Sequence, residues 1–175
     1  MGLNLNNMKP KLIILDGARG AGKSTVSNLL KDKIDNTVFI GLDFIRNLIT
    51  KSKATDDFNA IAFDAIFSIT DSFLSNNINV VIDSGITKER DKKLAEIAHK
   101  NGASIFMYYL SAPKEILWKR IQKRGEERKS MPNRERFDYT HGMQQAKDFS
   151  DFIEIDTTKN NPEEIVAKIL KKLHC

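Results

Sequence analysis

KLIILDGARGAGKST, residues 11–25, is the stretch that decides the fold of this chain. Its first six residues are almost continuously apolar, as in a β-strand that is buried on both faces. The next nine contain Gly17, Gly22, Lys23 and Ser24 at the spacing G-x-x-x-x-G-K-[ST], and the residues after them have the apolar periodicity of a helix. A strand, this loop and a helix in that order predict a phosphate-binding loop.

The residue types of this loop suit the binding of a polyphosphate. Glycines let the backbone curve closely enough for several N–H groups to point at one phosphate, and the helix N-terminus adds its positive end. Lys23 is predicted to place its charge on the β- and γ-phosphates, and the Ser24 hydroxyl to bind Mg²⁺. We therefore predict that a nucleotide polyphosphate and Mg²⁺ are bound by this loop, whose residues are Gly17, Ala18, Arg19, Gly20, Ala21, Gly22, Lys23, Ser24 and Thr25.

Short apolar runs alternate with helical patterns along the whole chain. Strands are predicted at residues 11–16, 37–42, 78–83, 103–110 and 151–156, and helices at about 22–34, 44–51, 56–75, 88–100, 114–124, 134–147 and 163–173. This alternation predicts an α/β protein, a five-stranded parallel sheet with helices on both faces, and together with the phosphate loop it predicts the three-layer P-loop NTPase fold. In such folds ligands bind at the carboxyl ends of the strands. We expect residues 1–175 to form a single domain.

The composition limits the class of protein. The 175 residues are 41% hydrophobic and 29% charged, as in globular proteins rather than disordered ones. No apolar run reaches the roughly 18 residues that a membrane helix needs, and the first residues lack the apolar core of a signal peptide. The single cysteine, Cys175, can form no internal disulfide. We expect a cytoplasmic protein with no membrane contact and no disulfide partner.

The net charge of +5 is confined to one part of the sequence. Residues 111–136 contain nine Lys or Arg and four Asp or Glu, whereas the rest of the chain has 19 of each. A surface that binds long polyanions would spread its charge more widely. We therefore interpret the excess positive charge as serving a function at one place in the structure.

An aspartate and an arginine follow the second predicted strand in GLDFIRNLIT, residues 41–50. Their place in the chain puts Asp43 and Arg46 at the carboxyl end of that strand, beside the phosphate loop. Asp43 is suited to orient or deprotonate an incoming hydroxyl, and Arg46, about one helical turn further on, to hold an anionic group of the acceptor. The alternative is that Asp43 is a helix N-cap and Arg46 an ordinary surface residue.

Two further segments offer charged side chains to the same site. A buried strand ends at Asp83, whose carboxylate would reach Mg²⁺ directly or through water, although it could simply start a turn. In the basic segment, Arg120 and Arg124 share one helix face, and Gly125 is expected to end that helix. We predict a basic lid at about residues 120–136 that closes over ATP, although a charged helix face is often only solvated.

The motifs resemble those of the P-loop kinases of the polynucleotide 5′-kinase type, such as the kinase domain of the bacteriophage enzyme. The resemblance rests on GARGAGKST, DFIR at 43–46, DSGITKER at 83–90 and RIQKRG at 120–125, which follow one another in the same order. Adenylylsulfate, shikimate and gluconate kinases, chloramphenicol phosphotransferases and zeta-type toxins are similar around the DFIR positions.

The resemblance also implies roles for individual residues. Lys23 and Ser24 would hold ATP and Mg²⁺, and Asp43 would be the general base. Arg46 would bind the phosphate next to the acceptor hydroxyl, with Ser84 as a helper. The lid arginines on the nucleotide would be Arg120 and Arg124.

These observations predict a Mg²⁺- and ATP-dependent kinase that phosphorylates an alcohol group, with Lys23, Asp43 and Arg124 as its catalytic residues. The motifs D-x-x-G and N-K-x-D of switch GTPases do not occur in the sequence. Because Arg46 needs an anion to hold, the acceptor is predicted to be a polynucleotide 5′-hydroxyl or a nucleotide-like phosphorylated molecule. A small-metabolite or antibiotic kinase, and a non-catalytic protein that binds ATP, remain alternatives.

Overall fold

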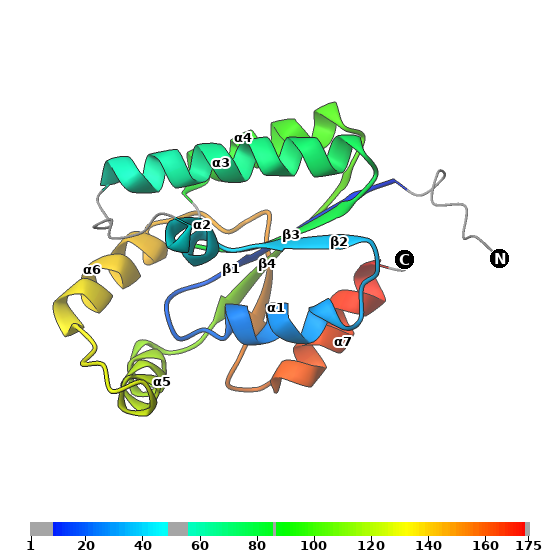
Figure 1. Cartoon of the computed structure of the whole chain (residues 1–175). Helices are drawn as coiled ribbons and strands as arrows, with labels where there is room; N and C mark the ends of the chain where they lie inside the picture. The colour runs from blue at the N-terminus through cyan, green and yellow to red at the C-terminus, as the bar shows by residue number, and fades with distance from the viewer. Residues whose placement is uncertain (1–8, 49–55, 86, 174–175) are drawn as a thin grey trace.

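Five strands form one parallel sheet in the order β2-β3-β1-β4-β5. The structure is a computed structural model that describes residues 9–48, 56–85 and 87–173 (Figure 1). The strands are β1 (Lys11–Asp16), β2 (Thr37–Ile40), β3 (Asn79–Asp83), β4 (Ser104–Ser111) and β5 (Ile153–Asp156). β1 lies at the centre because its four middle residues, Leu12 to Leu15, are apolar and are buried on both faces.

Helices cover both faces of this sheet. They are α1 (Lys23–Lys31), α2 (Leu42–Asn47), α3 (Asp56–Ser75), α4 (Lys88–Lys100), α5 (Lys114–Glu127), α6 (Arg134–Gln145) and α7 (Pro162–Leu173). Figure 1 shows α3 and α4 on one side of the strands and α1 and α7 on the other, with α5 and α6 beyond the carboxyl ends. The predicted three-layer α/β arrangement is confirmed.

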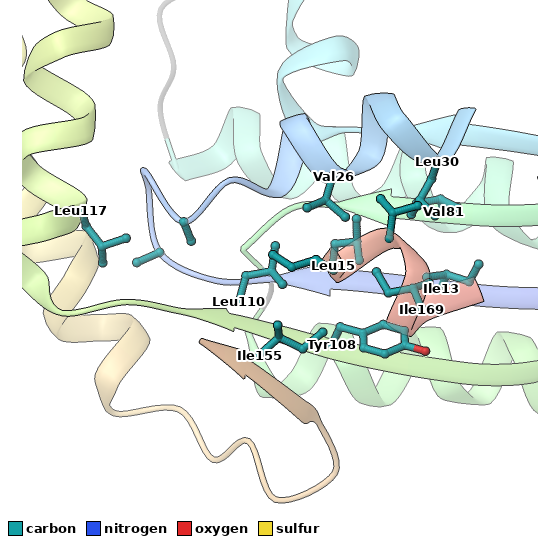
Figure 2. Close-up of a cluster of buried hydrophobic side chains, with 14 of the residues drawn as sticks. Ile13, Leu15, Val26, Leu30, Val81, Tyr108, Leu110, Leu117, Ile155 and Ile169 are labelled. Carbon is teal, nitrogen blue, oxygen red and sulfur yellow. The ribbon is translucent and has the colours of Figure 1, made fainter. Parts of the chain in front are cut away.

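Alternate residues of the strands enter two separate cores. Ile13 and Leu15 of β1 belong to the cluster that includes the buried side chains of α1, α5, α6 and α7, whereas Leu12 and Ile14 belong to the cluster with α2, α3 and α4. Figure 2 shows the first of these clusters, in which side chains of α1 and α7 lie over the strands. This alternation follows from the two-residue period of a strand.

The register of the strands brings their carboxyl ends together at one edge. Leu15 of β1 is paired with Asp83 of β3, and Ile40 of β2 is paired with Ile82 of β3. The phosphate loop after β1, the end of β3 and the start of α2 are therefore neighbours. This is the edge at which α/β proteins bind their ligands.

The structure corrects two predicted element ends. β2 ends at Ile40 instead of residue 42, and α2 begins at Leu42 with Gly41 as its N-cap. Asp43 therefore lies within the first turn and is not the helix cap. The predicted helix at 44–51 extends into residues outside the described part of the chain.

Gly125 does not end α5, which continues to Glu127. A Cβ at Gly125 would lie 2.6 Å from the carbonyl oxygen of Ser130 and 2.9 Å from Cδ of Pro132. The glycine thus permits close approach of the loop that leads to α6, instead of stopping the helix. In the described ranges, no helix is long and apolar enough to cross a membrane.

Candidate active site

The phosphate loop joins β1 to α1 and has the backbone that its glycines predict. Gly17 and Gly20 have φ values of 147° and 85°, and a Cβ at either position would lie within 2.7 Å of a backbone carbonyl oxygen, on Leu110 or Leu117. Only glycine fits such positions. The N-cap of α1 is Gly22, which places no side chain over the first turn of the helix. The N–H groups of that turn therefore face the loop, as an anion site requires.

Lys23 folds back over the loop. Its Nζ donates to the carbonyl oxygens of Gly17 and Ala18 at 2.5 and 3.3 Å. Burial holds the pKa of Lys23 below its ordinary value, and the carboxylates of Asp16 and Asp83 oppose this shift. The ammonium group is thus fixed at the centre of the loop, where the motif predicts a phosphate.

Ser24 and Asp83 meet beside this lysine. The Ser24 side chain hydrogen bonds to the carboxylate of Asp83, and a Cβ on Gly41 would collide with the same carboxylate. Burial raises the pKa of Asp83, whereas the Ser24 hydrogen bond and the charge of Lys23 lower it. One hydroxyl and one carboxylate at the edge of a phosphate site are the protein ligands that Mg²⁺ commonly takes.

Asp43 and Arg46 form an ion pair at the mouth of the site. The Arg46 guanidinium donates to Oδ1 of Asp43 at 3.1 Å and is held from the other side by Oδ1 of Asn59 on α3. The side chain of Asp43 is 90% exposed and that of Arg46 is 22% exposed. This contact is expected both if Asp43 and Arg46 are a base and an anchor and if they are an ordinary surface ion pair. It therefore does not distinguish the two interpretations.

The charge of Asp43 nevertheless reaches the phosphate loop. It opposes the lowering of the pKa of Lys23, and it adds to the raising of the pKa of Asp83, two shifts whose main cause is burial. The carboxylate therefore lies within electrostatic range of both groups that are predicted to bind the phosphates and Mg²⁺.

Three arginines from three segments gather near the loop. Partial burial lowers the pKa of Arg19, and the next causes are the positive charges of Arg136 on α6 and Arg124 on α5. Within the described residues, no carboxylate forms an ion pair with any of these three. Repulsion between unpaired cations makes such a cluster a favourable place for an anion.

A cavity of about 360 Å³ borders the phosphate loop. Its walls are formed by Gly20, Ala21, Gly22, Thr25, Val26, Arg120, Arg124, Thr157, Asn160, Asn161, Pro162 and Ile165. Asp43 and Arg46 do not line it, so the cavity and the Asp43–Arg46 pair are separate parts of the site. This separation suits a nucleotide in the cavity and an acceptor beside the pair.

Arg120 belongs to the wall of this cavity and also braces it. Its guanidinium donates to the hydroxyl and the carbonyl oxygen of Thr157 at 2.8 and 2.9 Å, and to the carbonyl oxygen of Gly20 at 3.4 Å. Arg120 thereby joins α5, the phosphate loop and the segment after β5. Its predicted contact with the nucleotide stays a prediction.

One predicted site residue, Ser84, is buried. Its side chain is only 4% exposed, and its hydroxyl is 3.5 Å from the carbonyl oxygen of Gly85.

Two residues near the loop were not predicted individually from the sequence. Arg136 was not singled out, because only Arg120 and Arg124 of α5 have a spacing that places them on one helix face. Asp16 was missed as well, although an aspartate at the last position of a buried strand is a recognisable signal.

The fold and the phosphate loop define a P-loop protein. The chain belongs to the zeta toxin family, whose model matches residues 3–166. It is 32% identical over 173 residues to L-seryl-tRNA(Sec) kinase of Methanococcus maripaludis, in an alignment that covers 91% of this chain and 65% of that protein. The chain thus spans slightly less than two thirds of the length of this relative.

Solved structures have the same architecture. A chain of the Pnkp1/Rnl/Hen1 RNA repair complex superposes with a TM-score of 0.64 at 26% identity, covering 80% of this chain and 46% of that chain. A gluconokinase from Sinorhizobium meliloti superposes with a TM-score of 0.66 at 20% identity, covering 96% of this chain and 98% of that chain. The second similarity concerns the fold alone.

Proposed function

We propose that this protein is an ATP-dependent kinase that uses Mg²⁺ and transfers the γ-phosphoryl group of ATP to a hydroxyl group carried on RNA or on a nucleotide-like acceptor. The proposal rests above all on one observation, the convergence of three features at the carboxyl ends of adjacent strands. These are Lys23 in the phosphate loop, the Ser24–Asp83 contact and the exposed carboxylate of Asp43.

The residues present fit a Mg²⁺ ion held partly by the nucleotide. Among the described residues, no three His, Cys, Asp or Glu side chains gather as a metal site. Mg²⁺ needs no such cluster, because it commonly keeps several waters and takes one or two carboxylates together with phosphate oxygens. When bound beside Ser24 and Asp83, the ion would neutralise charge on the β- and γ-phosphates.

In the proposed transfer, Asp43 accepts the proton of the acceptor hydroxyl. A bond forms between the hydroxyl oxygen and the γ-phosphorus while the bond from that phosphorus to the bridging oxygen breaks, and ADP leaves. Lys23 stabilises the charge on the phosphates throughout, together with the arginine cluster. Arg124 and Arg136 come from α5 and α6, so the segment that joins these helices is proposed to act as the lid.

Two observations favour an RNA-linked or phosphorylated acceptor. Arg46 presents a guanidinium next to the proposed base, and this group binds phosphate in a bidentate manner. The relative in M. maripaludis is named for a seryl group carried on a tRNA, and the similar repair complex is named for RNA. A hydroxyl close to an RNA phosphate would satisfy both Asp43 and Arg46.

A panel of acceptors and labelled ATP tests the proposal. The acceptors are a 5′-hydroxyl oligoribonucleotide, serine-charged tRNA, a nucleoside monophosphate, gluconate and chloramphenicol. We expect transfer to one of the first three. Transfer to gluconate or chloramphenicol alone would overturn the acceptor class, and ATP binding without transfer to any of the five would support the non-catalytic alternative.

The variant Asp43→Asn tests the role of the carboxylate. Loss of a general base lowers turnover by about 10²- to 10⁴-fold, so we expect a loss of this size with ATP affinity nearly unchanged. Asp151→Asn, which changes an exposed aspartate before β5, is the matched control. Full transfer by Asp43→Asn would show that another group accepts the proton.

A further inference from the structure

A buried ion cluster lies next to the phosphate loop and takes no part in the proposed chemistry. Nζ of Lys147 is 2.6 Å from Oδ2 of Asp16 and 2.5 Å from Oδ2 of Asp91. The three side chains are 6%, 0% and 12% exposed, respectively. They come from the segment after α6, the end of β1 and the first turn of α4, so the cluster joins three parts of the fold.

Asp16 connects this cluster to the phosphate loop itself. Its Oδ1 accepts hydrogen bonds from the backbone N–H of Gly17 at 2.5 Å and from Nε2 of Gln144 on α6 at 2.7 Å. Its Oδ2 binds Lys147, two residues beyond the end of α6. The last turn of α6 and the residues just after it are therefore tied at two points to the residue that begins the loop.

The ionic character of this tie needs an explanation. Burying three charged groups is costly because each ion loses its hydration, and apolar residues of similar volume often stabilise a fold as well or better. Hydrogen-bonded ions, however, fix directions and distances that an apolar contact leaves loose. The rings of Phe149 and Phe152, with centroids 4.9 and 4.6 Å from Nζ, enclose the ammonium and restrict it further.

The opposite end of α6 carries Arg136. Asn133 caps this end by accepting from the backbone N–H of Arg136 at 2.7 Å, and Phe137, 1% exposed, packs against Trp118 of α5. Arg136 precedes Gln145, the last residue of α6, by nine residues, about 14 Å along the helix. A small rotation of α6 about its anchored end would therefore displace Arg136 from Arg19 and the loop.

We propose that Lys147 is a positioning residue: by joining Asp16 and Asp91 it fixes the orientation of α6 on the phosphate loop and so holds Arg136 at the terminal phosphates of the nucleotide. The proposal rests on the proposed function only in that the bound molecule is a nucleoside triphosphate. It concerns the binding of that molecule and not the transfer to an acceptor.

A double-mutant cycle between Lys147→Met and Arg136→Ala tests this proposal. The probe is the non-hydrolysable analogue AMP-PNP with Mg²⁺, and binding is followed by the fluorescence of Trp118, the single tryptophan of the sequence. If Lys147 acts through Arg136, Lys147→Met weakens binding about tenfold in the wild-type background and less than about twofold in the Arg136→Ala background. Equal losses in both backgrounds would overturn the proposal, because they indicate a general structural role.

Two further measurements separate this proposal from the kinase activity and from loss of folding. Hydrogen exchange of the α6 amides, measured without nucleotide, should become faster in Lys147→Met while the amides of β1 and β4 remain protected. Unchanged exchange in α6 would overturn the proposed anchoring role of Lys147 whatever the result of the nucleotide experiment.

If Lys147→Met fails to fold, Gln144→Leu removes the other hydrogen bond from α6 to Asp16. This variant is expected to show the same coupling to Arg136 at smaller amplitude. Failure of transfer to every acceptor, with the cycle intact, would refute the proposed function and leave the anchor standing.

Discussion

At the scale of single residues, the Asp43–Arg46 pair contributes little to stability and much to the proposed chemistry. Exposed ion pairs are worth roughly 0–1 kcal/mol, and Asp43 is 90% exposed. Arg46 differs from its partner, because it is 22% exposed and also bound to Asn59 of α3. Its guanidinium is therefore held in place from α3 while the carboxylate beside it stays accessible.

Arg46→Ala should separate an acceptor-binding role from a structural one. We expect the KM for the acceptor to rise about tenfold or more, with the KM for ATP nearly unchanged, because the anion of the acceptor loses its bidentate partner. Asn59→Ala is the control, since it removes the bond to α3 and keeps the guanidinium. A loss of thermal stability in Arg46→Ala without a change in the acceptor KM would favour the surface ion pair.

Asp91 provides a prediction about pH. Burial raises its pKa from the ordinary value of an aspartate to about 6, while Lys147 opposes the shift and the charges of Asp16 and Glu89 add to it. An acid with a raised pKa in the folded state stabilises the fold below its unfolded pKa and loses this contribution as pH rises through the folded value. The stability of Asp91→Asn relative to the wild type should therefore rise between about pH 4 and about pH 7.

Urea denaturation across this pH range provides the measurement, with Asp151→Asn as the control that should follow the wild type. One oxygen of Asp91, Oδ1, is buried without a hydrogen-bond partner in the described structure, which is consistent with a group that binds a proton easily. A stability difference between Asp91→Asn and the wild type that does not change with pH would contradict the raised pKa.

At the scale of elements, the sequence predicted the features that are built from consecutive residues. It did not predict the features that depend on contacts between distant segments. The strands were predicted because each is a run of apolar residues buried on both faces, and the phosphate loop because its ligands are successive residues. The predictions for the end of β2 and for the role of Gly125 were wrong, because both depend on the packing of a neighbouring segment. The carboxylate of Asp83 lies against Gly41 after β2, and Pro132 lies against Gly125.

The same limit applies to the candidate site. Lys147 lies in a polar stretch with no pattern of its own, and its partners Asp16 and Asp91 are 131 and 56 residues away in the chain. Arg136 carries no signal that distinguishes it from the other basic residues of its segment. Only the fold shows that these side chains meet near the loop.

Arg120 allows a test of how three elements are held together. Arg120→Lys keeps the charge but cannot reproduce the two hydrogen bonds to Thr157, so we expect a loss of about 1–3 kcal/mol in the free energy of unfolding together with weaker AMP-PNP binding. Thr157→Val, which removes the hydroxyl and keeps the carbonyl oxygen, should show a smaller loss of both. Arg128→Lys, at the end of α5, is the control.

Unchanged stability with strongly weakened binding in Arg120→Lys would mean that Arg120 contacts the nucleotide and does not serve as a brace. An equal loss in Arg128→Lys would mean that the loss in Arg120→Lys does not depend on the particular contacts of Arg120. The free energy of unfolding and the affinity for AMP-PNP together therefore decide whether Arg120 acts mainly as a brace or mainly as a nucleotide contact.

At the scale of the whole molecule, the distribution of charge limits how an RNA acceptor could bind. The excess of +5 lies in residues 111–136, which form α5, the following loop and the start of α6, beyond the carboxyl ends of the strands (Figure 1). The rest of the chain carries as many acidic as basic residues. A nucleic acid is therefore expected to meet a net positive charge only where its reactive end enters the site.

This distribution predicts that the protein recognises the end of an RNA and not its length. For 5′-hydroxyl oligoribonucleotides of about 4 to about 16 nucleotides, kcat/KM should be nearly constant, because the sequence outside residues 111–136 carries no net positive charge. The logarithm of kcat/KM should fall only weakly with the logarithm of the salt concentration, since each phosphate contact adds about 0.7 to the slope and few contacts are available.

Steady-state transfer of labelled phosphate at several salt concentrations provides the measurement, with hydrolysis of ATP in the absence of acceptor as the control. A steady rise of kcat/KM with length, or a steep salt slope, would show that the charge of residues 111–136 combines with other surfaces into an extended binding path, and the interpretation of this segment as a local lid would then fail.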